Sequence, residues 1–386
     1  AQEGGIARAE RHVVGAEAGV EAGVGVHTSS TRSPSKTVMS PGVSVISIMK
    51  QRSRRDVLGA LGVAGLAGLA GCGGNDGGSS ASSDSTGTVG VFHAGSLTAA
   101  FDDLEDGFTE RYDAAVSQES AGSVRSTTKI TQPPHRAADV LAVADFRLLR
   151  DDLLPDYGDW YAVFATNAMT VAYTEQSAYS DEFGPETWWD VLARDDVVVG
   201  HSDPAIDPNG YRALMSMKLG AIPYEGDALY DEATADALKA NATIPASDEV
   251  DLVGQLQTGK LDYAWSYRSF GATHDVETID LQTAVDLSGS TRAYADHYAK
   301  ATVEVGGTTY VGSPIAYGVT VPSTATHPEV GASWIAYMLG DGAATLAADG
   351  FETLAPAVVP EQHDDVVPDA VMAAAETRSA LGPLSL

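Results

Sequence analysis

Residues 89–112, VGVFHAGSLTAAFDDLEDGFTERY, join a short apolar run to a helical pattern through a turn of small residues. The run 89–93 predicts a strand, and the positions after the turn predict an amphipathic helix. Its apolar face carries Leu97, Phe101, Leu104, Phe108 and Tyr112. A strand that leads directly into such a helix is the building unit of an α/β sheet, and this constrains the fold more than any other feature.

The same alternation continues along the chain. Further strands are predicted over 139–144, 168–174, 197–200, 261–267 and 315–322. Helical patterns lie between them at 210–221 and 249–259. A final helix is predicted over 327–350, ending at Gly350 before a proline-containing tail. The 386 residues are 44% apolar, which is enough for a substantial α/β core and for two domains.

The charge balance is strongly acidic. There are 53 Asp and Glu residues against 23 Lys and Arg, a formal net charge of -30. This argues against nucleic acid as a partner, because phosphate binding needs a basic face. The acidic residues are spread along the chain and indicate adaptation to concentrated salt, where ions screen repulsion beyond ~3 Å at about 1 M. An ordinary acidic protein is the alternative.

Residues 50–72, KQRSRRDVLGALGVAGLAGLAGC, have a basic start, an apolar run and then small residues. This order is typical of a secretory signal, and Arg54-Arg55 resembles a twin-arginine export signal. Cys72 is the single cysteine, which excludes a disulfide framework. It ends a segment that resembles a lipobox, so we expect lipidation of Cys72 and anchoring to the outer face of the cell membrane. An uncleaved short membrane helix is the alternative.

The segments on either side of this signal have no predicted fold. Residues 1–49 show no periodicity and contain Met39 and Met49, so they are an unassigned extension. After the expected cleavage, residues 72–87 comprise the lipidated cysteine and a Gly/Ser/Asp-rich tether. The folded body is therefore expected to begin at about residue 88.

Ligand sites on α/β sheets form at the carboxyl ends of strands, where helix N-termini favour anions. Two Gly-Ser corners have this setting, Gly95-Ser96 and Gly122-Ser123. Each serine can cap its helix, which is the simpler interpretation, or direct its hydroxyl to a ligand.

Two further corners carry polar side chains. In HSDPAIDPNGYRALM, Asp-Pro pairs stiffen the loop, and Asp207 is either a turn-former or a carboxylate directed into a cleft. In YAWSYRSFG, a strand ends near Ser266 and Tyr267. Alternation places these two side chains on opposite faces unless the strand breaks there. Arg268 is expected to pair with a carboxylate.

Enzyme motifs are mostly missing. The sequence has no Gly-x-Ser-x-Gly elbow, no His-Glu-x-x-His and no phosphate-binding Gly-rich loop. No metal-ligand pair of histidines is found at helical spacing in the folded body. We therefore expect no enzyme, no catalytic residue and no cofactor. A secreted hydrolase using Ser96 or Ser123 is the alternative from a different class.

The segments FHAGSL, ESAGS, DVLAVADF, WYAVFATNAMTVAYT, DPNGYR and LDYAWSYRS occur in one order. Together they resemble the molybdate/tungstate substrate-binding proteins of ABC importers, in particular the archaeal tungstate/molybdate branch. The resemblance covers about residues 89–360. It implies a type II periplasmic-binding-protein-like fold, in which two α/β lobes joined by a two-strand hinge close over an oxyanion. Lobe I would comprise 88–172 and 312–386, and lobe II 173–311.

The resemblance also implies site residues. Gly95 and Ser96 match the first oxyanion-binding corner, and Ser123 matches the second. Tyr267 matches the binding tyrosine. The segment Glu249-Val250 matches a helix start that gives a backbone N–H. Asp207 matches a carboxylate that reaches the metal of the oxyanion in the archaeal branch.

A second carboxylate of that branch directly precedes the binding tyrosine, and here Ser266 occupies this position. The hypothesis from sequence is therefore tetrahedral binding, or lopsided coordination through Asp207 alone. The implied function is a lipid-anchored, monomeric receptor that delivers molybdate or tungstate to a membrane permease with its ATPase. Receptors for sulfate, thiosulfate or phosphate are the alternative within the class.

Overall fold

The computed structural model describes residues 87–245 and 248–386. The predicted extension, export signal, Cys72 and nearly all of the tether lie outside the described residues. No helix within the described part is both long and apolar enough to cross a membrane.

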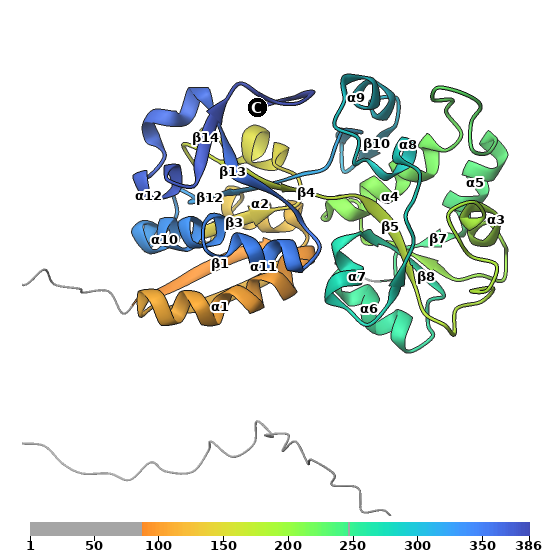
Figure 1. Cartoon of the computed structure of the whole chain (residues 1–386), viewed down its shortest axis with the longest axis horizontal. Helices are drawn as coiled ribbons and strands as arrows, with labels where there is room; N and C mark the ends of the chain where they lie inside the picture. Colours follow the sequence, from red (N-terminus) through yellow and green to blue (C-terminus); the bar gives the residue numbers. More distant parts are fainter. Residues whose placement is uncertain (1–86, 246–247) are drawn as a thin grey trace, which may run out of the picture. The chain divides into compact units, whose positions relative to one another are not determined.

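A seven-stranded mixed sheet organises the first half of the folded body, which we call lobe I (Figure 1). Its strands, in spatial order, are β14 (Ala375–Arg378), β13 (Glu352–Pro360), β4 (Ala162–Thr166), β12 (Ala316–Thr320), β3 (Val140–Val143), β1 (Thr88–Ala94) and β2 (Ala115–Ala121). β1 is parallel to β2 and β3, whereas β12 is antiparallel to β3 and β4. The small strands β15 (Ala380–Leu381) and β16 (Leu384–Ser385) follow near the C-terminus.

The helices of lobe I pack on its sheet. Successive side chains of β1 belong to two different apolar clusters. Val91 belongs to the larger apolar cluster, and Phe92 belongs to a second one. The helical segments are η1 (Gly95–Leu97), α1 (Thr98–Tyr112), α2 (Ser123–Thr131), η2 (Leu148–Leu153), α10 (Pro328–Leu339), α11 (Ala343–Ala348), η3 (Glu361–Val366) and α12 (Asp369–Met372). The predicted apolar face of α1 is confirmed. Phe101 and Phe108 are fully buried, with ring centroids 5.7 and 5.0 Å from that of Trp334 on α10.

A five-stranded sheet organises the other half, lobe II. Its strands are β7 (Ala242–Thr243), β6 (Val199–Gly200), β8 (Tyr263–Tyr267), β5 (Met169–Tyr173) and β9 (Glu277–Thr278). Its helices are α3 (Trp188–Leu192), α4 (Pro208–Leu219), α5 (Glu232–Asn241), α6 (Val250–Gln257), α7 (Ser269–Thr273), α8 (Thr283–Asp286) and α9 (Arg292–Tyr298). A hairpin of β10 (Thr302–Val305) and β11 (Thr308–Val311) follows them.

The chain passes between the two sheets twice. The first crossing runs through Asn167 and Ala168, from β4 to β5, and the second runs through 312–315, from β11 to β12. The first crossing lies a few residues before the expected end of lobe I at 172, because Met169–Tyr173 pairs with β8 of lobe II. The predicted α/β architecture with two lobes is present.

One predicted helix is wrong. The expected helix over 327–350 is two helices, α10 and α11, separated at Gly340–Gly342. The N–H groups of Gly340 and Gly342 both donate to Tyr337 O, at 3.2 and 2.9 Å, which closes the end of α10 and turns the chain. The helices predicted at 210–221 and 249–259 are confirmed as α4 and α6.

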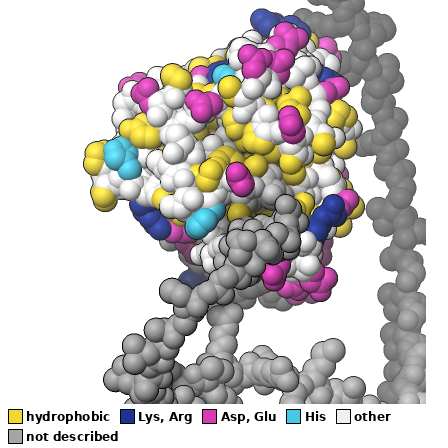
Figure 2. Space-filling model, turned by 90° about the vertical axis from the view of Figure 1, so that its left-hand side faces the viewer, with side chains coloured by type: hydrophobic (Ala, Val, Ile, Leu, Met, Phe, Trp, Pro, Cys, Tyr) yellow, Lys and Arg dark blue, Asp and Glu magenta, His cyan; other side chains and the backbone are white. Residues whose placement is uncertain are grey.

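Acidic side chains are dispersed over one face of the folded body. On the face shown in Figure 2, Asp and Glu side chains lie scattered among apolar ones, and Lys and Arg are sparser. The negative charge is therefore not gathered in one patch of this face.

Candidate functional site

The two Gly-Ser corners of lobe I lie directly against lobe II. The N–H of Gly122 donates to Asp248 Oδ1 at 2.6 Å, and Arg125 N–H donates to Ile206 O at 3.2 Å. At the other corner, a Cβ built on Gly95 would lie 3.8 Å from the backbone nitrogen of Val250. Glycine at both corners thus allows backbone from the two lobes to approach closely.

The serine hydroxyls at these corners do not cap helices, so the capping alternative is wrong for both. Neither η1 nor α2 has a side-chain cap, and the residue before α2 is Gly122. Ser96 Oγ lies 2.9 Å from the hydroxyl of Tyr317 on β12. The fully buried Ser123 Oγ accepts the N–H of Ala144 at 2.9 Å, which leaves its own proton to donate.

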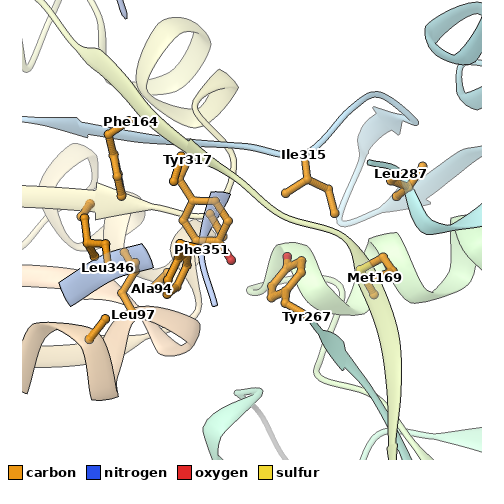
Figure 3. Packing of buried hydrophobic residues seen from close by; sticks show 14 of the residues in the cluster. Ala94, Leu97, Phe164, Met169, Tyr267, Leu287, Ile315, Tyr317, Leu346 and Phe351 are labelled. Carbon is orange, nitrogen blue, oxygen red and sulfur yellow. The ribbon is translucent and has the colours of Figure 1, made fainter. Parts of the chain in front are cut away.

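Tyr267 adds a hydroxyl group from lobe II to those of Ser96, Ser123 and Tyr317, and we call these four the hydroxyl cluster. The Tyr267 hydroxyl accepts a hydrogen bond from Arg212 Nη1 at 2.8 Å, and the same nitrogen donates to Ala144 O of lobe I at 2.9 Å. The rings of Tyr267 and Tyr317 lie 6.0 Å apart, and Figure 3 shows their hydroxyls facing the same space. Hydroxyl groups from both lobes therefore converge where β8 and β12 face each other.

Asp207 lies at the N-terminus of α4, where Pro208 starts the helix. Its Oδ1 accepts the N–H of Asn209 at 3.1 Å, so it is the N-cap. Its Oδ2 accepts the N–H of Glu249 at 3.1 Å, and the residue is only 4% exposed. Burial raises the pKa of Asp207 to about 6, although these backbone donors oppose the rise. Asp207 is both a turn-former and a carboxylate buried beside the cluster.

Glu249 is the residue directly before α6. The backbone N–H predicted to serve a ligand is already donated to Asp207. Its carboxylate Oε1 instead accepts the hydroxyl of Ser266 at 2.8 Å and the N–H of Tyr267 at 3.0 Å. Burial, and then the nearby charge of Asp207, raise the pKa of Glu249 to about 8.

A second set of contacts fastens the lobes beside this cluster. Asp145 of lobe I accepts the hydroxyl of Tyr211 at 2.7 Å and forms ion pairs with Arg147 and Arg212, at 2.6 and 3.3 Å. Burial opposes its ionisation, but the two guanidinium groups outweigh burial and hold the pKa of Asp145 well below its usual range. Tyr310 of the β10–β11 hairpin stacks on Tyr211 with centroids 4.2 Å apart.

All eight predicted binding residues therefore lie at or beside the contact between the lobes: Gly95, Ser96, Ser123, Asp207, Glu249, Val250, Ser266 and Tyr267. Arg268, by contrast, forms an ion pair with Glu352, which is the simple pairing expected from sequence.

Sequence reasoning missed Tyr317, Arg212 and Asp145. Tyr317 and Arg212 lie within an apolar strand and an amphipathic helix, where they look like core and surface residues. Asp145 could have been identified from sequence, because DVLAVADF places a carboxylate just after a fully apolar strand.

No three His, Cys, Asp or Glu side chains within 87–245 and 248–386 are grouped so that they could hold a metal ion. Asp207 and Glu249 are thus a pair of carboxylates in a hydroxyl-lined contact, and the donor set suits an anion.

Two α/β lobes, joined by two crossing segments and meeting over buried hydroxyl groups, define a two-lobe ligand-binding protein with the type II periplasmic-binding-protein fold. The profile of the bacterial extracellular solute-binding protein family matches residues 89–352, and the chain belongs to this family. It is therefore a solute-binding protein rather than an enzyme, and its ligand is cargo rather than cofactor. Family membership overturns the hydrolase alternative.

Relatives cover most of the folded body. An uncharacterized solute-binding protein of Methanoculleus marisnigri is 40% identical over 315 residues, which span 75% of this chain and 87% of that protein. The molybdate/tungstate-binding protein WtpA of Thermococcus kodakarensis is 35% identical over 281 residues, 66% of this chain and 78% of that protein. The sulfate-binding protein SubI of Mycobacterium tuberculosis shares the fold, with a TM-score of 0.51, 12% identity and coverage of 75% and 94%.

Proposed function

We propose that this protein captures molybdate or tungstate outside the cytoplasm and delivers it to the permease and ATPase of an ABC importer. The observation that carries the proposal is the convergence of hydroxyl groups from both lobes, of which Ser96 and Tyr317 come from lobe I and Tyr267 comes from lobe II. The similarity to WtpA of Thermococcus kodakarensis, whose name states molybdate/tungstate binding, supports this choice of anion.

The chemistry suits a dianion. A hydrogen bond to a charged group contributes about 1.5–3 kcal/mol, so several neutral donors can hold a dianion without a lysine. Ser96 and Ser123 are the proposed hydroxyl donors of lobe I, and Tyr267, held by Arg212, is the donor of lobe II. The backbones of Gly95 and Val250 approach each other, and their N–H groups are the proposed backbone donors.

The mechanism is lobe closure. A ligand that touches donors of both lobes stabilises the arrangement in which the lobes meet, and it shifts the equilibrium by its differential affinity for that arrangement. Arg212 links ligand and closure, because one nitrogen contacts both Ala144 O of lobe I and the Tyr267 hydroxyl of lobe II.

The cellular location that we propose for the receptor is based on the sequence outside the described residues. We include in the proposal a twin-arginine signal, lipidation of Cys72, a flexible tether and function as a monomer. The charge of -30 supports operation in concentrated salt. Export and lipidation are tested by mass spectrometry of the N-terminal peptide from native membranes, which is predicted to start at a lipidated Cys72.

The function is tested by thermal unfolding in high salt with tungstate, molybdate, sulfate, thiosulfate and phosphate. A ligand at about 100 times its Kd adds about 2.7 kcal/mol to stability, so tungstate and molybdate are predicted to raise Tm clearly. Ser96→Ala is expected to reduce this shift, and Ser379→Ala, at an exposed serine of lobe I, is the matched control. A shift with sulfate, thiosulfate or phosphate alone would assign the receptor to another oxyanion.

A further inference from the structure

The side chain of Asn167 lies in the first crossing between the lobes and reaches the hydroxyl cluster. The residue is 1% exposed and stands between β4 of lobe I and β5 of lobe II. Its amide nitrogen Nδ2 donates to Ser269 Oγ, at the start of α7 in lobe II, at 2.9 Å. The same nitrogen donates to the hydroxyl of Tyr317, on β12 in lobe I, at 3.5 Å. One buried amide thus connects the crossing segment to both lobes.

Two backbone donors fix which way this amide faces. The N–H of Ala168 donates to Asn167 Oδ1 at 2.9 Å, and the N–H of Ser269 donates to the same oxygen at 3.4 Å. An N–H group can bond only an acceptor, so the amide oxygen must face these two groups and the amide nitrogen must face the other way. The two hydrogens of Nδ2 are therefore directed at Ser269 Oγ and at the oxygen of the Tyr317 hydroxyl.

The orientation of the amide sets the direction of the hydrogen bond between Tyr317 and Ser96, whose oxygens lie 2.9 Å apart. The Tyr317 hydroxyl accepts from Asn167, so its own proton is free to be donated to Ser96 Oγ. Ser96 then accepts from Tyr317 and keeps its proton for a ligand. In the reverse direction Ser96 would donate to Tyr317 and present only lone pairs to a ligand, and lone pairs repel an anion.

The other two hydroxyl groups of the cluster are each directed by a single donor. The Tyr267 hydroxyl accepts from Arg212 at 2.8 Å, and Ser123 Oγ accepts the N–H of Ala144 at 2.9 Å. Each of these hydroxyl groups keeps its own proton to donate to an anion. Ser96 differs from them, because its direction depends on a second hydroxyl and hence on the residue that orients that hydroxyl.

We propose that Asn167 is a positioning residue of the site, which sets the direction of the hydrogen bond from Tyr317 to Ser96 and so makes Ser96 a donor to the bound oxyanion. This inference rests on the proposed function. Asn167 lies in a segment that joins the lobes, and it also holds Ser269 of lobe II. The alignment of Ser96 therefore depends on how the two lobes are arranged.

The test is a double-mutant cycle of tungstate affinity, measured by isothermal titration of the full chain at one high salt concentration. Asn167→Ala removes the donor to Tyr317 and is predicted to weaken tungstate binding by about tenfold. In the Tyr317→Phe background the path to Ser96 is missing, so the same change is predicted to weaken binding by less than about twofold. The loss is thus predicted to be at least about fivefold larger when the Tyr317 hydroxyl is present.

Equal losses in the two backgrounds would overturn the role of Asn167 and leave the proposed function standing, whereas failure of the wild type to bind tungstate would overturn both. Asn241→Ala is the matched control, because the Asn241 amide donates to three backbone carbonyls of lobe II. It is predicted to lower stability and to leave tungstate affinity unchanged. Should Asn167→Ala not fold, Asn167→Asp takes its place in the cycle. It keeps the shape and the acceptor oxygen, and its added charge is the same in both backgrounds, so the fivefold difference is again predicted.

Discussion

Asp207 joins two elements of lobe II through a single carboxylate. One oxygen caps α4, and the other holds the N–H of Glu249 ahead of α6. The residue is thus part of the scaffold, and we propose from the resemblance to the archaeal branch that it is also a ligand to the metal of the cargo. Asp207→Asn removes the charge and keeps one acceptor oxygen, so it compares the role as a ligand with the role in the scaffold.

We predict that Asp207→Asn weakens tungstate binding by more than about tenfold, because a neutral amide is a poorer ligand to a hard metal centre. Stability should fall by about 1–3 kcal/mol, because the amide oxygen can accept only one of the two backbone N–H groups and the other is left buried without a partner. Isothermal titration and urea unfolding measure the two effects. Unchanged affinity would reduce Asp207 to a turn-former.

Asp286 provides a test of how stability depends on pH, and this test needs no ligand. Its carboxylate accepts the N–H and hydroxyl of Ser288, at 2.8 and 2.9 Å. Burial raises its pKa to about 6 from 3.8, while Ser288 and Arg268 oppose the rise and Glu352 adds to it. The folded state therefore binds the proton more tightly than the unfolded state, and stability falls as pH rises from about 3.8 to about 6.

We predict that Asp286→Asn is more stable than the wild type at pH 7.5, by on the order of 2 kcal/mol, and that the difference disappears below about pH 4. Urea unfolding at the two pH values measures it. Asp280→Asn, at an exposed aspartate of the same lobe, is the matched control. A gain of equal size at both pH values would contradict the linkage.

At the scale of elements, the start of α2 determines how closely the lobes meet. A Cβ on Gly122 would lie 2.4 Å from Ile206 O and 2.9 Å from Asp207 Cβ, both in lobe II. These are backbone and near-backbone atoms that cannot rotate away. Glycine here is therefore needed for contact between the lobes, whereas Gly254 within α6 has open space around it.

We predict that Gly122→Ala lowers tungstate affinity by at least about tenfold, because the added methyl holds the lobes apart. Gly254→Ala should leave affinity unchanged and raise stability by about 0.5–1 kcal/mol, since alanine favours a helix interior. Titration calorimetry on both variants tests this, and equal affinities for Gly122→Ala and the wild type would refute the steric argument.

The elements also show where prediction from sequence works. Strands β1, β3, β5 and β8 were predicted because each is an apolar run buried on both sides. β2 was missed because its alternating exposure and polar residues lack an apolar run. β13 was missed because Pro356 and Pro360 argue against a strand, although it joins the edge region of the sheet beside β14.

The residues of the candidate site likewise fall into two groups, those that local sequence indicated and those that it did not. Ser96, Ser123 and Asp207 follow strands or begin helices, so local sequence indicated them. The pairing of Glu249 with Ser266, by contrast, depends on how α6 meets β8 in space, and no local pattern encodes it. Tyr317 was missed for a similar reason, because only its contact with Ser96 distinguishes it from a core tyrosine.

At the scale of the whole molecule, the chain has a net charge of -30, and on the face shown in Figure 2 the acidic side chains are dispersed. Self-repulsion of this kind destabilises a compact state, and salt relieves it. We predict that Tm rises by at least about 2 °C between 0.1 and 1 M KCl. Scanning calorimetry measures the change, and a Tm that falls with salt would contradict adaptation to concentrated salt.

The central claim is that the two lobes meet over a molybdate or tungstate ion. The most direct test is isothermal titration of the full chain with tungstate, molybdate and sulfate at one high salt concentration. We predict one-to-one binding of tungstate and molybdate, with sulfate at least about tenfold weaker. Tighter binding of sulfate, or no binding of either metal oxyanion, would contradict the claim.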